Sequence, residues 1–329
     1  MALLEINDLR TEIQLKEGVV HAVDGVTLHV DEGETLGIVG ESGCGKTMTA
    51  LSIMKLLPTG GSIVGGSIKL SGTEISSLSD EDMRRVRGNE IGMIFQDPLT
   101  SLNPTMTVGK QIAEAVKLHR GANNEQAMDR AAEVLNLVGL PRPAERLSDY
   151  PHQLSGGLRQ RVMIAMALAL RPRLLIADEA TTALDVTTQA QIMELLLDLQ
   201  EELGMALIMI SHDLGLAASY ADEVIVMYAG KIVEQAPAAR LFGTGGAVRM
   251  RYTRALLDAI PHLERSAHTP LPVVGGRPPD PTALPRGCSF APRCQYAEDD
   301  CLAKVPALAE HAPGHRWACW HPCENGGAA

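Results

Sequence analysis

The sequence is poor in aromatic residues, in long apolar runs and in positive charge. Phe, Trp and Tyr make up 3% of its 329 residues, which leaves few rings on which nucleic-acid bases could stack. Its 29 Lys and Arg residues against 40 Asp and Glu residues give a net charge of −11. Because backbone phosphates attract basic surfaces, this balance predicts no nucleic-acid partner, and any phosphate chemistry must be local.

Apolar stretches are too short to cross a membrane. The longest run, residues 162–170, falls well short of the roughly 18–20 residues that a bilayer requires. The first residues also lack the charged and apolar regions of a signal peptide. Because 45% of residues are hydrophobic and 21% are charged, the composition predicts a globular protein that is neither secreted nor membrane-spanning.

Strand-like and helical segments alternate in an order that predicts an α/β fold. Apolar runs separated by glycine-containing turns predict strands in the first 95 residues. Apolar residues at helical spacing, for example between Ala131 and Val138, predict an inserted helical subdomain at about residues 97–170. Short apolar runs at 174–178 and 206–211, with a helical stretch between them, are typical of a parallel sheet.

Composition changes near residue 250. Beyond it prolines become frequent, and five of the six cysteines lie between residues 288 and 323. We therefore predict a boundary near residue 250 and a Cys-rich extension over 251–329. Since the sequence predicts a reducing compartment, clustered thiols favour a metal site over disulfides.

A glycine-rich segment predicts a phosphate-binding P-loop. Residues 40–47 follow a strand-like run and precede a helical stretch, which is the context that a P-loop requires. Glycines let N–H groups and the helix N-terminus face the phosphates, while Lys46 adds charge and Thr47 offers a hydroxyl to Mg²⁺. A chance glycine-rich turn is the alternative. The predicted nucleotide-binding residues here are Gly40, Glu41, Ser42, Gly43, Cys44, Gly45, Lys46, Thr47 and Met48.

The apolar run at 174–178 ends in two carboxylates. In P-loop enzymes the first of them, Asp178, holds the metal, and Glu179 can polarise an attacking water. A carboxylate after a buried strand is by itself more often a helix cap or a surface charge. The assignment therefore depends on the remaining motifs.

Those motifs resemble the signature elements of ABC-type ATPases. Residues 154–160, LSGGLRQ, resemble the signature sequence, and residues 183–185 resemble the D-loop, which ends in Asp185. The resemblance implies a RecA-like parallel sheet core, an antiparallel β subdomain and an inserted helical subdomain. It makes Gln96 the Q-loop residue and His212 the H-switch, and it implies that both are catalytic together with Glu179. It also implies Thr47, Gln96 and Asp178 as Mg²⁺ ligands.

The signature sequence also implies a dimer. Ser155, Gly156 and Gly157 precede a predicted helix that runs to Leu170, so their N–H groups and the helix dipole can meet a γ-phosphate. In this family that phosphate belongs to nucleotide bound by the opposite subunit. One chain would therefore carry halves of two different sites.

Longer stretches resemble one branch of the family, the ATP-binding subunits of dipeptide/oligopeptide importers, which also includes nickel and glutathione importers. The resemblance predicts an ABC ATPase domain over 1–250 and an oligopeptide-transporter-type extension over 251–329. It implies ATP-driven uptake of peptides or a related small solute at the cytoplasmic face of the membrane. It also implies two permease subunits, an external solute-binding protein and a second ATPase subunit, with a heterodimer favoured over a homodimer. The resemblance is carried by residues 96–104, 150–168, 181–192, 212–234 and 252–261.

The Cys-rich extension resembles that of the same branch, in which four cysteines can ligate a 4Fe–4S cluster. Spacing alone fits neither common zinc sites nor ferredoxins and leaves zinc and iron–sulfur about even; the resemblance favours iron–sulfur. Unligated cysteines in an unstructured tail are a third reading, although clustered thiols would be prone to oxidation. The predicted ligands are Cys288, Cys294, Cys301 and Cys319, with His321 and Cys323 as alternates.

Three features depart from the branch. Ala180 stands where proline is usual, and residues 249–257 replace the usual lead-in to the extension. Residues 10–23 contain no Phe, Tyr or Trp, so His21 is the only flat ring there for stacking on adenine.

Two functions other than transport are alternative interpretations of the sequence. A soluble ABC ATPase in DNA repair or translation is disfavoured by the single motif set, the lack of sustained heptads and the negative charge. A non-catalytic nucleotide-dependent or redox-sensing module would be favoured by a degenerate Glu179 or His212, and both residues are intact.

Overall fold

The computed structural model describes the chain except for residues 1, 183, 244–245, 261–272 and 325–329. The chain folds into two compact units. The first comprises residues 1–3, 30–34 and 77–210, and the second comprises residues 4–29, 35–76 and 211–329. The P-loop segment and the Cys-rich extension therefore belong to the same unit, while the boundary near residue 250 stays a prediction.

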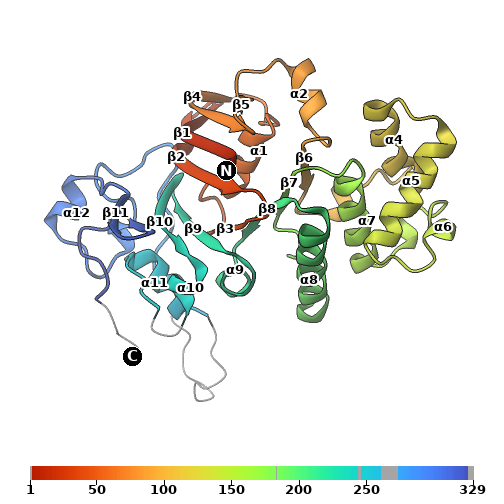
Figure 1. Cartoon of the computed structure of the whole chain (residues 1–329). Coiled ribbons are helices and arrows are strands. Elements are labelled where there is room, and N and C mark those ends of the chain that lie inside the picture. The colour runs from red at the N-terminus through yellow and green to blue at the C-terminus, as the bar shows by residue number, and fades with distance from the viewer. Residues whose placement is uncertain (1, 183, 244–245, 261–272, 325–329) are drawn as a thin grey trace. The chain divides into compact units, whose positions relative to one another are not determined.

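The first unit contains parallel strands, which are labelled β6, β7 and β8 in Figure 1. Strands β6 (Ile91–Ile94), β7 (Leu174–Asp178) and β8 (Ala206–Ser211) pair in this order. Every residue of β7 and β8 is buried, as expected for parallel strands covered on both faces. Helix α8 (Val186–Leu203) connects β7 to β8, and α2 (Asp80–Val86) precedes β6. The strand–helix–strand order predicted from the sequence is confirmed.

Helices fill the stretch between β6 and β7. A capping box between Asn123 and Gln126 begins α5, whose Ala131, Val134 and Leu135 are buried as their helical spacing predicted. Helix α7 ends at Leu168, two residues before the predicted end. The elements of this stretch are α3 (Pro98–Ser101), α4 (Val108–Arg120), α5 (Asn124–Leu137), α6 (Pro143–Arg146), the 3₁₀-helix η1 (Pro151–Gln153) and α7 (Gly156–Leu168).

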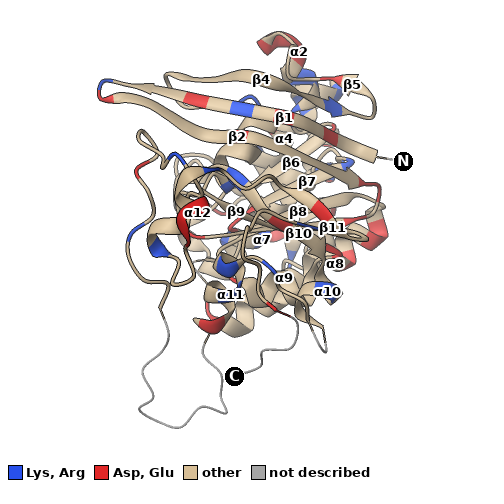
Figure 2. Ribbon diagram, turned by 90° about the vertical axis from the view of Figure 1, so that its left-hand side faces the viewer, with Lys and Arg blue, Asp and Glu red and all other residues tan. Residues whose placement is uncertain are grey.

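An antiparallel sheet lies mostly within the second unit. Its order is β2-β1-β4-β5, and β1 pairs with β4 in a register that places Leu4 opposite Leu70. Figure 2 shows basic and acidic residues following one another along β1. The predicted antiparallel β subdomain is therefore present. Its strands are β1 (Ala2–Leu15), β2 (Gly18–Asp31), β4 (Gly61–Leu70) and β5 (Thr73–Glu74).

The second unit also contains a mixed sheet in the order β3-β9-β10-β12-β11. Strand β9 is parallel to β3 and antiparallel to β10, with which it forms the predicted hairpin around Ala229 and Gly230. Helix α1 follows β3 and ends at Ile53, before the predicted Leu57, and Lys55 then adopts a left-handed φ of 49°. The elements of this part are β3 (Thr35–Val39), α1 (Lys46–Ile53), α9 (Leu214–Tyr220), β9 (Glu223–Tyr228), β10 (Lys231–Pro237) and α10 (Ala238–Phe242).

The Cys-rich extension continues this mixed sheet, which the sequence did not predict. Strand β12 pairs with β10, so that Glu234 lies opposite Trp317. The fully buried carboxylate of Glu234 accepts hydrogen bonds from the Arg249 and Met250 N–H groups and contacts His315 Nε2 at 2.9 Å. The elements of the extension are α11 (Arg251–Asp258), η2 (Ala291–Arg293), α12 (Asp299–Ala303), β11 (Ala309–Ala312) and β12 (His315–Trp317).

Within the described part of the chain, none of the helices combines the length and apolarity needed to cross a bilayer.

Candidate nucleotide site and cysteine pocket

The P-loop between β3 and α1 follows a path that requires glycine. Gly40, Gly43 and Gly45 have φ values of 152°, 79° and 110°, which L side chains rarely adopt. A Cβ atom on Gly45 would also lie 2.6 Å from the Ala22 carbonyl oxygen, and one on Gly40 would lie 2.4 Å from that of Met227. Both contacts are with backbone atoms that cannot move aside easily.

Lys46 lies against the main chain of this loop. Its Nζ donates to the Gly40 and Glu41 carbonyl oxygens at 2.8 and 3.0 Å, and the residue is 4% exposed. Thr47 and Met48 follow in the first turn of α1, where both are partly exposed. The N-cap residue is Gly45, which makes no side-chain cap hydrogen bond. The N-terminus of a helix is a general anion-binding position in proteins.

The remaining P-loop residues differ in exposure. Ser42 and Gly43 are exposed, whereas Cys44 is buried. Burial raises the pKa of the Cys44 thiol, which keeps it in the protonated form. Cys44 therefore fills space beneath the loop.

In the first unit, Gln96 meets Glu179 at the end of β7. Gln96 Nε2 donates to Glu179 Oε2 at 2.8 Å, and the Thr182 hydroxyl donates to the same oxygen at 3.1 Å. Glu179 has a left-handed φ of 48°, and its N–H bonds the Ile210 carbonyl. The preceding residue, Asp178, is 2% exposed. The Q-loop glutamine and Glu179, the residue directly after β7, thus form one hydrogen-bonded group.

The signature and D-loop residues begin two helices of the first unit. Ser155 caps α7 by accepting the Leu158 N–H at 3.4 Å, so Gly156 and Gly157 form the first helical turn. Asp185 caps α8 in the same way, and hydrogen bonds from the Thr188 N–H and hydroxyl lower the pKa of its carboxyl. Ala183 of the D-loop lies outside the described residues.

The predicted nucleotide residues are divided between the units. Gln96, Ser155, Asp178, Glu179 and Asp185 lie in the first unit, whereas the P-loop lies in the second. His212 directly follows β8 and is exposed. That Lys46 and Thr47 share one Mg–ATP site with Asp178 and Glu179 stays a prediction.

His21 forms an ion-pair contact with Glu12 of strand β1. Its Nδ1 lies 3.1 Å from the Glu12 carboxylate, and its side chain is 47% exposed. The stacking of His21 on adenine stays a prediction.

All four cysteines predicted as cluster ligands line one pocket of the second unit. Cys288, Cys294, Cys301 and Cys319 line one small pocket whose other side chains are mainly apolar and aromatic. The Cys288 N–H also bonds the Cys301 carbonyl at 2.7 Å, which fixes the backbones of these two residues relative to each other. Residues scattered along the extension therefore converge.

The environment of these thiols disfavours their negative charge. Burial raises the pKa of Cys319 to about 11, and the neighbouring Cys288 and Cys294 act in the same direction. Burial also raises the pKa of Cys288, although the backbone N–H groups of Phe290 and Ala291 oppose this shift. Converging thiolates need a cation, so the donor set fits a metal or an iron–sulfur cluster.

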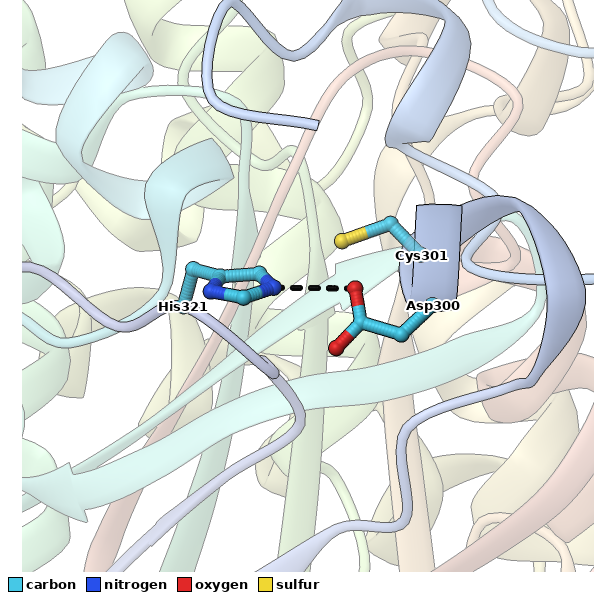
Figure 3. A group of neighbouring side chains, drawn as sticks. All are labelled: Asp300, Cys301 and His321. Carbon is cyan, nitrogen blue, oxygen red and sulfur yellow. Dashed lines mark hydrogen bonds and ion pairs between the residues drawn. The ribbon is translucent and has the colours of Figure 1, made fainter. Parts of the chain in front are cut away.

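The alternate ligand His321 lies beside Cys301 (Figure 3). His321 Nε2 is 2.9 Å from Asp300 Oδ1, and ligand atoms of Asp300, Cys301 and His321 lie within 4.8 Å of one another. This hydrogen bond raises the pKa of His321. The other alternate, Cys323, is buried, and its N–H bonds the Arg249 carbonyl.

The residues through which the extension contacts the P-loop were not predicted from the sequence. The Tyr252 hydroxyl accepts the Glu41 N–H, and Arg293 forms an ion pair with the Glu41 carboxylate. Arg249 and Arg251 bond carbonyl groups near the end of the described chain, at Cys323 and at His321. The unusual segment 249–257 was the sequence signal for Arg249, Arg251 and Tyr252.

Two families match this chain. The family described as "ABC transporter" matches residues 23–182, and the family described as "Oligopeptide/dipeptide transporter, C-terminal region" matches residues 233–301. A solved dimeric ATP-binding cassette, bound to ADP and phosphate after hydrolysis, is 30% identical with a TM-score of 0.64 and covers 71% of this chain and 98% of its own. These matches and the P-loop geometry define a P-loop ATPase of the ABC class.

Relatives extend the match to nearly the whole chain. A probable peptide ABC transporter ATP-binding protein of Sinorhizobium fredii is 51% identical, over 98% of this chain and 96% of its own. The dipeptide transport ATP-binding protein DppD of Escherichia coli is 48% identical over 99% of both chains. The oligopeptide transport ATP-binding protein OppD of Bacillus subtilis is 49% identical over 97% of this chain and 89% of its own. The chain belongs to the ATP-binding proteins of peptide ABC transporters.

Proposed function

We propose that this chain hydrolyses ATP as one nucleotide-binding subunit of a membrane ABC importer and couples dimer closure to uptake of peptides or a related small solute. The observation that carries the proposal is the hydrogen bond of 2.8 Å from Gln96 to Glu179 at the end of β7. It holds the carboxylate that the mechanism requires. Among the described residues, nothing favours a role in DNA repair or translation.

The P-loop and the two carboxylates at the end of β7, Asp178 and Glu179, have different roles in hydrolysis. The loop N–H groups and Lys46 bind the phosphates, and His212 contacts the γ-phosphate. Glu179 accepts a proton from water while the water oxygen bonds to the γ-phosphorus and the bond to the bridging oxygen breaks, which gives ADP and phosphate.

Mg²⁺ would bind the hydroxyl of Thr47, the carboxamide of Gln96 and the carboxylate of Asp178. These are oxygen donors, which Mg²⁺ prefers, and Asp178 is a carboxylate with 2% exposure, which suits a cation. When bound, Mg²⁺ supplies positive charge to the phosphate oxygens.

Ser155, Gly156 and Gly157 act on nucleotide bound by a second subunit. They begin α7, a helix of 13 residues, whose N-terminus favours negative charge. Asp185, in the D-loop, takes part in the same shared nucleotide site. The second ATPase is a homologous but different chain, with a homodimer as the alternative. The solved relative is a dimer of ATP-binding cassettes, which supports the pairing of two ATPase subunits.

The remaining partners are two permease subunits in the membrane and an extracytoplasmic solute-binding protein. The ATPase would lie at the cytoplasmic face as a peripheral subunit. Its substrate class follows from the relatives, whose names state dipeptide and oligopeptide transport.

The assembled transporter with Glu179→Gln tests the mechanism. ATP should bind normally, while hydrolysis and peptide uptake into vesicles fall by about 10²–10⁴-fold, the usual contribution of a catalytic base. Glu194→Gln, at an exposed position of α8, is the matched control and should retain both activities. Near-normal hydrolysis in the Glu179 variant would contradict the proposal.

We further propose that Cys288, Cys294, Cys301 and Cys319 ligate a 4Fe–4S cluster, with zinc as the alternative. Their convergence on one pocket supports this. The cluster, when bound, would cross-link a proline-rich segment. Its role is structural, since the nucleotide motifs are complete without it.

Metal analysis of anaerobically purified protein tests the cysteine site. We expect about four iron and four sulfide per chain, lost in Cys301→Ser and kept in Cys323→Ser, because Cys323 is an alternate outside the proposed set. Stoichiometric zinc without sulfide would overturn the cluster. A metal-free protein with an ordered extension would overturn any metal site.

A further inference from the structure

Glu41, the second residue of the P-loop, is held by the C-terminal extension. Arg293 Nη1 donates to Glu41 Oε2 at 2.6 Å, and Nη2 donates to Glu41 Oε1 at 2.9 Å. Such parallel bonds fix the carboxylate in orientation as well as in distance. Separately, the Glu41 N–H donates to the Tyr252 hydroxyl at 2.9 Å. Both the side chain and the main chain of Glu41 are thus anchored.

The Arg293 guanidinium is fully engaged in this position. A guanidinium has five N–H donors, and two of them bind Glu41. The others bind the Tyr228 hydroxyl at 3.2 Å and the carbonyl oxygens of Gly275 at 2.7 Å and Val274 at 3.1 Å. Its side chain is 3% exposed. A buried charge with every donor satisfied has one geometry, so Arg293 is a rigid support.

Tyr252 is rigid for a different reason. Its ring packs on those of Tyr228 and Phe290, with centroid distances of 4.5 and 5.3 Å, and the residue is fully buried. Burial raises the pKa of Tyr252 far above its usual range, so the hydroxyl stays protonated. It can therefore accept from Glu41 without carrying charge into the P-loop.

The anchored residue in turn shapes the binding loop. The carbonyl oxygens of Gly40 and Glu41 both accept hydrogen bonds from Lys46 Nζ. A shift of Glu41 would therefore move acceptors of the lysine that the proposed function places on the phosphates. The contacts connect Arg293 to Lys46 through one residue.

We propose that Arg293 and Tyr252 are positioning residues of the ATPase: the extension holds the P-loop in the conformation that binds ATP. This inference rests on the proposed function of the P-loop. It assigns the extension a role in nucleotide affinity, in addition to any metal that the extension binds.

The test compares Arg293→Met and Tyr252→Phe with Arg249→Met in the assembled transporter. Arg249 is the matched control, because it also bonds the end of the extension, at the Cys323 carbonyl, but does not contact the P-loop residue Glu41. Arg293→Met should weaken ATP binding about tenfold, which corresponds to about 1.4 kcal/mol, and raise KM with little change in kcat. Tyr252→Phe should give a smaller shift in the same direction, and Arg249→Met none.

A double-mutant cycle with Glu41→Gln separates positioning from general destabilisation. The double variant should bind ATP no more weakly than Arg293→Met alone, because one interaction is lost in both. Equal weakening by Arg249→Met, or unchanged affinity in Arg293→Met and Tyr252→Phe together, would overturn the inference. Unchanged affinity with normal hydrolysis leaves the proposed function standing, whereas a wild-type transporter without ATPase activity overturns the proposed function itself.

Discussion

The P-loop and the cysteine pocket are built in opposite ways. The P-loop is one contiguous segment, and its shape comes from main-chain angles at Gly40, Gly43 and Gly45. The cysteine pocket gathers side chains from Cys288 to Cys319 around one space. A site made by consecutive backbone atoms is encoded locally, while a site made by distant side chains depends on the packing of everything between them.

Gly45→Ala tests the local site and should have the largest effect. The added Cβ would meet the Ala22 carbonyl oxygen at 2.6 Å, so the loop must change shape and ATP binding should be lost. Gly33→Ala is the control for strain alone: its φ is 73°, and its Cβ would meet nothing within 4 Å. It should cost about 1–2 kcal/mol in free energy of unfolding and leave nucleotide binding intact, as measured with a fluorescent ATP analogue.

Glu234→Gln tests the packing on which the distant site depends. The buried carboxylate accepts two main-chain N–H groups and contacts His315, and an amide would leave one of these groups unsatisfied. We expect a loss of about 3 kcal/mol in denaturant unfolding and faster proteolysis of the extension. Glu310→Gln, at an exposed position of β11, should change neither; a loss as large as that of the Glu234 variant would contradict the anchoring role.

Ser155→Ala tests whether Ser155, the N-cap residue of α7, also contributes to ATP hydrolysis. Ser155 and Ser79 each accept a hydrogen bond from an N–H group in the first turn of a helix, so removal of either hydroxyl should cost about 1 kcal/mol of stability. Ser155→Ala should lower the ATPase activity of the assembled transporter, whereas the control Ser79→Ala should leave it unchanged. Equal activity in the two variants would remove Ser155 from the proposed shared site.

Asp24→Asn should have the smallest effect. Burial opposes ionisation of Asp24, but Lys231 and Arg10 outweigh it and lower its pKa. The stabilisation is therefore present above the unfolded pKa of about 3.9 and is lost as pH falls through the lower folded pKa. Urea unfolding should show a deficit of about 0.5–1 kcal/mol at pH 7 that begins to shrink below about pH 4 and is gone once the pH is below the folded pKa; a deficit that persists at still lower pH would contradict this assignment.

The sequence predicted elements whose pattern is contiguous. The P-loop with its flanking strand and helix, strand β7, helix α8 and the β9–β10 hairpin all have local periodicity or turn residues. The predicted end of α1 lies beyond the observed end, because nothing in the sequence indicates that Lys55 adopts a left-handed φ. Gln96 and Glu179 were named through motifs, but their hydrogen bond required the structure.

The parts that could not be predicted depend on long-range pairing. Arg293 and Glu41 are 252 positions apart, and neither residue type specifies its partner. Strands β11 and β12 are short, so their pairing comes from the edge of β10 and not from their own sequence. The four cysteines could be named as donors, whereas their shared pocket is a result of folding.

The pairing of β12 with β10 has a consequence for solubility. The edge of β10 that β12 covers runs along Val233, Glu234 and Gln235, and an uncovered strand edge can pair with another chain. Strand β12 covers this edge, and the outermost strand is then β11, four residues long with Glu310 and His311 exposed. A short, polar outer strand is a poor template for aggregation. A chain truncated before β11 would expose this edge of β10 and lose this protection against intermolecular sheet growth.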